Sequence, residues 1–157
     1  MANYIYPAPG VANVEVTLTL VASSVAGNLS IPSLQDVTIN NSNDVFTWTQ
    51  LDSGSKKQIA TTATNSLAMN LVLDKTTFFG NASASAGSAT KLGVFGMSKD
   101  KTLVNFTLFM GKENVGNANV TVSGSGYVTG LAPTVSADSP VWVSPITITV
   151  DGDYTIS

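Results

Sequence analysis

The sequence contains no cysteine, no histidine and no arginine. Without cysteine the chain has neither a disulfide framework nor a thiolate site. Without histidine it lacks the commonest metal ligand and any side chain whose ordinary pKa lies near neutrality. Without arginine, and with a net charge of −3, it is a poor candidate for tight binding of phosphates or nucleic acid.

Charged residues of either sign are also scarce. They make up 11% of the 157 residues, whereas globular proteins carry about a quarter, and hydrophobic residues make up 43%. The surface of such a chain is either covered by Ser, Thr and Asn or buried against other copies of the chain, and we favour the second interpretation. The length predicts one domain, 1–157.

The sequence shows no membrane-directed segment. The N-terminus MANYIYPAPGVANV lacks a basic region followed by an apolar run, so we expect no signal peptide. No stretch approaches the roughly eighteen apolar residues of a transmembrane helix. We therefore expect a protein that is made in a cytoplasm and does not contact a membrane.

Alternation of apolar and polar residues predicts an all-β fold of about seven strands, a β-sandwich or partial barrel. One short flanking helix is expected over 88–98, capped by Ser88. Residues 1–10 are expected to form an extended arm, 51–65 an extended polar loop, and 80–90 a flexible Ala/Ser-rich loop. The expected strands are 14–20, 34–39, 44–51, 66–73, 102–110, 119–135 and the segment after residue 140.

The last expected strand has two distinct faces. Trp142, Ser144, Ile146, Ile148 and Val150 alternate with a face of Val, Pro and Thr. Pro140 and Pro145 lack a backbone donor, so they suit an edge, a strand start or a bulge. The sequence Asp-Gly-Asp at 151–153 is typical of a turn that ends the strand.

No group of residues predicts catalysis, and we expect no cofactor and no metal ion. Asp151 and Asp153 are the only close acidic pair, and a turn explains them better than half of a calcium site. Trp48, Trp142 and Tyr127 could form an aromatic platform for sugars. Phe46 and Trp48 share one strand face, however, which favours a core stripe.

Three segments together resemble the major tail tube proteins of tailed bacteriophages. These segments are FTWTQLDSGSKKQIATTATNSLAMNLVLD (46–74), LGVFGMSKDKTLVNFTLFMG (92–111) and GSGYVTGLAPTVSADSPVWVSPITITVDGDY (124–154).

The resemblance implies a structural virion protein that self-assembles into hexameric rings. Neighbouring sheets would join into one barrel, and the rings would stack into a tube that conducts DNA without binding it specifically. The expected partners are other copies, a tail sheath or terminator, a tape measure and distal tail proteins. The loop 51–65 would contact the next ring through Asp52, Lys56, Lys57, Gln58, Thr61 and Thr62.

The composition agrees with this interpretation, since a ring buries surface and removes exposed sheet edges. The alternatives are a virion decoration domain, a carbohydrate-binding β-sandwich module and a pilin-like subunit. The absence of cysteine and of a signal sequence disfavours the pilin-like subunit.

Overall fold

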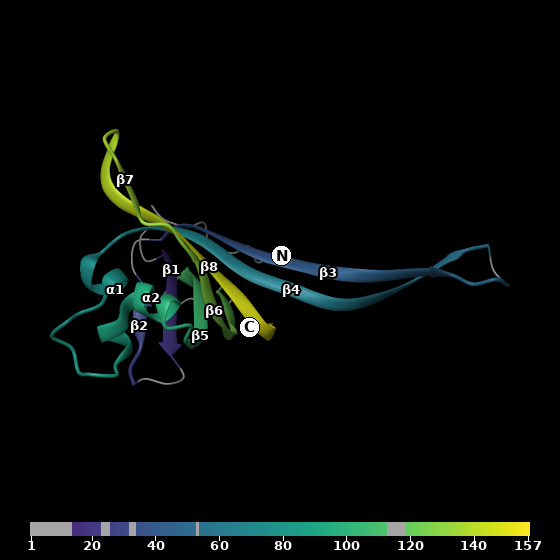
Figure 1. The fold of residues 1–157 in the computed structure, drawn as a ribbon, viewed down its shortest axis with the longest axis horizontal. Coiled ribbons are helices and arrows are strands. Elements are labelled where there is room, and N and C mark those ends of the chain that lie inside the picture. The colour runs from purple at the N-terminus through teal and green to yellow at the C-terminus, as the bar shows by residue number, and fades with distance from the viewer. Residues whose placement is uncertain (1–13, 23–25, 32–33, 53, 113–118) are drawn as a thin grey trace.

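The computed structural model describes residues 14–22, 26–31, 34–52, 54–112 and 119–157 (Figure 1). The arm expected over residues 1–10 lies outside these ranges. The described chain contains two short helices and eight strands. Their order is β1 (Val14–Ala22), β2 (Leu29–Ile31), β3 (Leu34–Thr49), β4 (Lys56–Val72), α1 (Lys75–Phe79), α2 (Ala89–Lys99), β5 (Leu103–Lys112), β6 (Val120–Leu131), β7 (Thr134–Ser136) and β8 (Ser139–Ile156).

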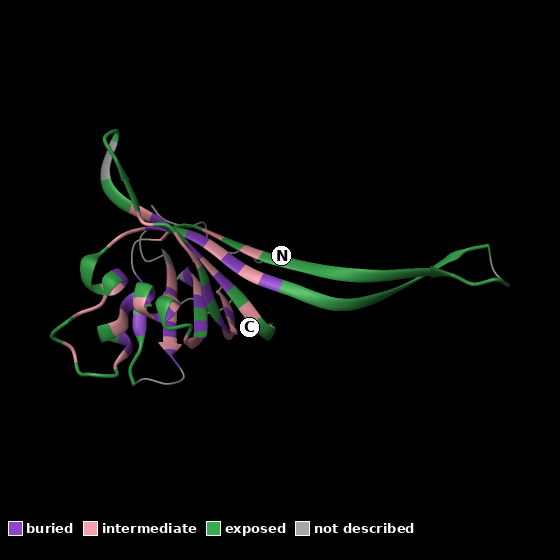
Figure 2. Cartoon of the chain, viewed as in Figure 1, coloured by how far each residue is buried: buried purple, intermediate pink, exposed green. Residues whose placement is uncertain are grey.

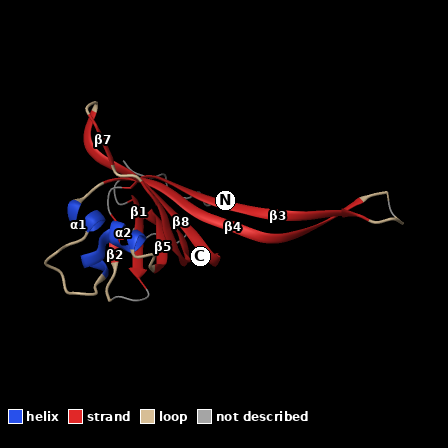
Figure 3. Ribbon diagram, in the orientation of Figure 1, coloured by secondary structure: helices blue, strands red, loops and turns tan. Residues whose placement is uncertain are grey.

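The strands form one open antiparallel sheet, which confirms the all-β class. Along the sheet the order is β2-β1-β5-β6-β8-β4-β3, and β7 pairs with the outer part of β8. Figure 3 shows both helices on the same side of the sheet. The helices thus cover the face that a second sheet would cover in a two-layered sandwich.

The core lies between this face of the sheet and the helices (Figure 2). Alternate residues of each central strand point into it, such as Leu18 and Leu20 on β1 and Ile146 and Ile148 on β8, as the alternation predicts. Each such side chain contributes about 1.5–3 kcal/mol of hydrophobic stabilisation when fully buried. The helices supply Phe78, Ala89, Val94 and Met97.

The expected helix over 88–98 is confirmed as α2, with the Ser88 side chain accepting from the Lys91 N–H. Helix α1 is a short additional helix, capped by Asp74. Lys91 also contacts the Ala/Ser-rich loop over 80–90. Its Nζ donates to the carbonyl oxygens of Ala82 (3.3 Å) and Ala84 (3.5 Å) and so attaches the loop to α2.

Two glycines allow the two helices to meet. Gly93 interrupts α2 with φ 64° and ψ 178°, and a Cβ there would lie 2.5 Å from the Gly80 nitrogen. At Gly80 (φ 92°) a Cβ would overlap the Lys91 carbonyl oxygen. A side chain fits at neither position, so the close approach of the helices depends on both glycines.

The region between the second and fourth expected strands differs from the prediction. The segments 34–39 and 44–51 belong to one strand, β3, and residues 56–65 are part of β4 rather than of a polar loop. Alternation of apolar residues reveals a strand only where one face is buried. Here both faces are exposed, and the strands are defined by their mutual pairing, from Asn40↔Ser66 to Thr49↔Lys56.

The turn expected at Asp151–Asp153 is also wrong. Strand β8 continues to Ile156, and Gly152 (φ 83°) lies in a bulge between the pairs Gly126↔Val150 and Gly124↔Tyr154. Beyond the bulge the backbones of Ser157 and Thr121 exchange two hydrogen bonds. The local sequence favours chain reversal, but pairing with β6 continues the strand.

Candidate functional site

The most exposed part of the described structure is a long hairpin made by the outer halves of β3 and β4. Asn65 is the last buried residue of β4 toward the hairpin tip, and residues 56–64 are all exposed. At about 3.3 Å per residue this part is about 30 Å long. Figure 2 shows it projecting from the body as a continuous exposed ribbon. We call residues 40–64 the arm.

A β-bulge divides the arm. Asn43 pairs with Ala63, but the next pair is Val45↔Ala60, so Asp44 faces two residues, Thr61 and Thr62. The Thr62 hydroxyl donates to an Asp44 carboxylate oxygen at 3.3 Å, and the Thr61 hydroxyl donates to the Asp44 carbonyl oxygen at 3.2 Å. A bulge increases local twist and redirects the strand beyond it, so this one sets the direction of the distal arm.

The distal arm carries an apolar face. Phe46 and Trp48 stack with their ring centroids 5.9 Å apart, and Ile59 lies directly opposite Phe46. Phe46 is 60% exposed and Ile59 56% exposed, and Leu51 projects fully from the tip. The core stripe predicted from Phe46 and Trp48 is therefore wrong, because the strand pair that carries them has no second layer. An apolar patch of this kind usually marks an interaction site.

All six residues predicted to make inter-ring contacts lie on the arm. Asp52 is in the tip turn, and the other five are exposed on the β4 strand of the arm, with Thr61 and Thr62 in the bulge. Whether they contact another ring stays a prediction. The prediction missed the neighbouring apolar residues, although their adjacency at 45, 46 and 48 was a signal that both strand faces carry apolar side chains.

The aromatic platform predicted as an alternative does not form. Trp48 pairs with Lys57 near one end of β4, whereas Trp142 precedes Val143, which pairs with Val72 at the other end. This separation is about 50 Å along the strand. Tyr127 lies on β6 within the body. The three rings cannot contact one sugar chain together, so this support for a carbohydrate-binding module is lost.

The sheet has a second, uncovered face opposite the helices. Most side chains on this face are uncharged, and they include Thr17, Thr19, Ala68, Asn105, Thr107, Ser123, Ser125, Thr129, Thr147 and Thr149. The same face also carries the carboxylates of Asp36, Asp151 and Asp153 and the rings of Phe109 and Tyr127. Many of them bond to one another across strands, such as Thr129 to Thr149 at 2.9 Å and Ser125 to Asn105 at 2.7 Å. The result is a surface made mainly of hydroxyl and amide groups, with a few carboxylates.

The sheet also has two open edges. Strand β3 has a neighbour only on its β4 side among the described strands. At the opposite edge, β2 is three residues long and covers only Leu18–Leu20 of β1. Unpaired backbone groups on an edge can bind a strand of another chain.

Within the described ranges, no three His, Cys, Asp or Glu side chains gather as a metal site would require. Hydrogen bonds from the Thr76 hydroxyl and from the Thr77 N–H and hydroxyl lower the pKa of Asp74, which is explained by its role as the α1 cap. None of the described helices is long and apolar enough to span a membrane.

Comparison with known proteins finds similarity in the fold but not in the sequence. No family model and no curated protein sequence matches the chain. Among solved structures, the tail of an empty GTA particle refined with C6 symmetry matches with a TM-score of 0.64 at 12% identity, over 96% of this chain and 99% of that chain. The SPP1 tail tube protein matches with a TM-score of 0.62 at 10% identity, over 95% and 79% of the two chains.

The chain has the fold of these tail proteins. A sheath–tube complex of an extracellular contractile injection system, PVC, extends the similarity, with a TM-score of 0.56 at 15% identity over 97% of this chain and 92% of that chain. The tail tube fold is thus shared over nearly the whole length of chains whose sequences differ almost completely. This agrees with the resemblance found in the sequence.

Proposed function

We propose that the protein is a structural subunit of a phage-type tail tube. It self-assembles into hexameric rings, and the rings stack into a conduit through which DNA leaves the capsid. The observation that carries this proposal is that solved tail structures share the fold over at least 95% of the chain. One of these structures is a tail with C6 symmetry.

The open edges of the sheet support ring formation. In a ring, the β3 edge of one subunit can pair with the exposed β1–β2 edge of the next, so that six sheets form one closed barrel. Closure satisfies the backbone groups that each edge leaves unpaired and removes sites for uncontrolled aggregation. It also accounts for the low charge of the chain, because part of its surface is buried between copies.

The uncovered face of the sheet supports the role of a conduit. The helices cover the other face, so a closed barrel of these sheets can place the helices outside and the Ser/Thr-rich face inside. Each Lys or Arg contact with a phosphate would strengthen binding of DNA and slow its passage. A wall without arginine, made mainly of hydroxyls that bond to one another and of a few carboxylates, would not attract phosphates in this way.

The length of the arm supports the proposal that rings stack on one another. The arm extends about 30 Å beyond the body, far enough to reach a subunit of an adjacent ring. In this proposal Asp52, Lys56, Lys57, Gln58, Thr61 and Thr62 contact that ring, together with the exposed apolar residues beside them.

The further partners are the proteins that surround and terminate a tube: a sheath or terminator, a tape measure and distal tail proteins. The solved structures with this fold include a PVC sheath/tube terminator and a PVC sheath–tube complex. The protein would be made in the host cytoplasm and function in the virion.

Electron microscopy of the purified protein tests the proposal. We expect rings or hollow tubes of uniform width in negative stain, and a protein that remains monomeric at high concentration would refute it. A shortened variant provides a second test. In it, residues 44–62 are replaced by Asn-Gly, a two-residue turn that closes the hairpin at the Asn43↔Ala63 pair. This variant should form rings or monomers that do not elongate. The matched control is T47S/T49S, which keeps the arm intact.

A further inference from the structure

A groove lies between helix α1 and strand β8, at the opposite end of the body from the arm. It has a volume of about 240 Å³ and is lined by Leu73, Lys75, Phe79 and Trp142. The Leu73 N–H donates to the Trp142 carbonyl oxygen at 2.8 Å, which fixes one wall to the other. Since a cavity of about 150 Å³ binds benzene, this groove has room for a large aromatic side chain.

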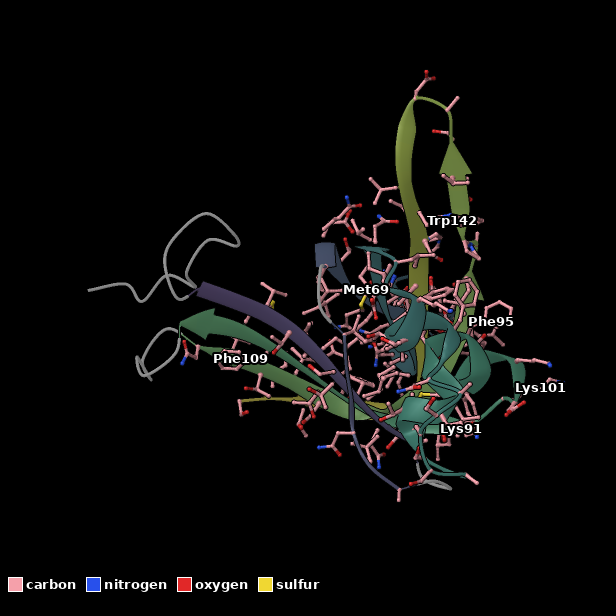
Figure 4. All side chains as sticks on the ribbon, turned by 90° about the vertical axis from the view of Figure 1, so that its left-hand side faces the viewer. Met69, Lys91, Phe95, Lys101, Phe109 and Trp142 are labelled. Atoms are coloured by element: carbon pink, nitrogen blue, oxygen red, sulfur yellow. The ribbon has the colours of Figure 1, made fainter. Side chains whose placement is uncertain are left out.

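The groove belongs to an exposed aromatic surface on the helix side of the molecule. Phe79 is 49% exposed and Trp142 48% exposed, and the Phe95 ring lies 5.7 Å from the Phe79 ring. Phe78, which is fully buried, packs edge-on against Phe79 at 4.9 Å and anchors it. Figure 4 shows Trp142 where the β7–β8 hairpin leaves the body, above Phe95. The surface is thus preorganised and yet uncovered.

We propose that this groove receives the aromatic face of the arm of a second copy, with Trp48 as the inserted side chain. The inference rests on the proposed tube function and names the surface that the arm contacts. The arm of the same chain cannot fill the groove. Figure 1 shows α1 and the arm tip at opposite ends of the molecule, and they are about 50 Å apart along β4.

The charges around the two surfaces are complementary. Lys57 lies opposite Trp48 on the arm, and Asp74, the α1 cap, stands in the sequence between the groove residues Leu73 and Lys75. Asp52, in the arm tip, provides a negative charge for Lys75. Each sign on the arm therefore has an opposite sign at the groove, in a chain where charges are few.

The contact is heterologous, since the arm and the groove are different surfaces of one chain. Such contacts repeat from copy to copy and build rings or open stacks rather than closed two-fold dimers. Every subunit then contributes one arm and one groove, so an interior copy has both apolar surfaces covered. Only the copies at the two ends of a stack leave one surface free.

Disulfide cross-linking tests the contact directly, because the natural chain has no cysteine. Copies with K57C are mixed with copies with K75C and assembled under mild oxidation. We expect a covalent heterodimer, identified by mass. The matched control pairs K57C with K101C and should give no heterodimer, since Lys101 is an exposed residue that follows the C-terminal cap of α2.

Complementation gives a second readout. W48A and W142A should each weaken elongation at least about thirty-fold, as for a hot-spot residue. The double variant should be no worse than either single one, because both remove one contact. Y127A, which truncates an aromatic residue 40% exposed on the opposite face, should elongate normally.

The mixture of W48A and W142A should form pairs of subunits or pairs of rings, but no stack longer than a pair. W142A keeps an intact arm and W48A keeps an intact groove, so only one contact can form between them. Normal tubes without a K57C–K75C cross-link, or tubes formed by W142A as by the natural chain, would overturn the groove contact and leave the tube function standing. A natural chain that never assembles would overturn both.

Discussion

Substitution of Gly93 by alanine should test whether the kink in α2 is required for the helix layer. Gly93 has φ 64° and ψ 178°, a conformation that is almost restricted to glycine and costs about 1–3 kcal/mol for other residues. The added Cβ would also lie 2.5 Å from the Gly80 nitrogen and 2.6 Å from the Phe78 carbonyl oxygen. Displacing this backbone costs about another 1–3 kcal/mol.

We therefore expect G93A to lower the free energy of unfolding by about 4 kcal/mol, a large share of the roughly 5–15 kcal/mol of an ordinary domain. The measurement is urea unfolding followed by far-ultraviolet circular dichroism, at a concentration where the subunit is unassembled. The matched control is G87A. Gly87 also has a positive φ of 72°, but a Cβ there meets nothing within 4 Å.

The control should lose about 1–2 kcal/mol, from backbone strain alone. The difference between the two variants then measures the close approach of α1 and α2. If G93A and G87A lose the same free energy, the contact between Gly93 and the Phe78–Gly80 backbone does not limit the fold, and the reasoning is refuted. The result also bears on the groove, because α1 carries Lys75 and Phe79.

Two further predictions concern single polar side chains. The folded-state pKa of Asp74 is lowered by Thr76 and Thr77, so its charge stabilises the fold above the ordinary value of 3.8, and this contribution is lost as the pH falls through the lowered pKa. The natural chain should thus be more stable than D74N by a constant amount near neutral pH, and this difference should shrink in acid. Urea unfolding of both proteins across pH measures the difference, and a difference that does not change in acid would contradict the prediction. Asn65 is 4% exposed, and its Oδ1 has no hydrogen-bond partner within the described structure. N65L should raise the free energy of unfolding by about 1 kcal/mol, whereas N41L, at the exposed cross-strand neighbour, should change it by less than about 0.5 kcal/mol, and a destabilised N65L would show that this oxygen is satisfied.

The sequence was most informative where a strand has one buried face. The alternation of Ser144, Ile146 and Ile148 with Pro145 and Thr147 predicts their two environments correctly, because burial on one face imposes a period of two on the side chains. The same reasoning locates β5 and the inward side of β4. The cap at Ser88 was readable for a local reason, since its side chain bonds to a backbone group three residues away.

The sequence was least informative where neither face is buried. Residues 40–43 and 56–64 carry no apolar alternation, and their extended conformation comes from pairing between segments distant in the chain. The stacked pair Phe46 and Trp48 looks like a core stripe in the sequence. Whether an apolar face is inside depends on whether another layer covers it, which no local pattern records.

The composition by itself determined that the chain is weakly charged and has no cysteine, histidine or arginine, since these properties depend only on which side chains are present. The alternation determined most strands and their inward faces. Only the tertiary structure decided that two strands leave the body as an arm, that their aromatic residues are exposed, and that a groove at the other end is open. These features depend on which segments lie side by side, and that is set by long-range pairing and packing rather than by neighbouring residues.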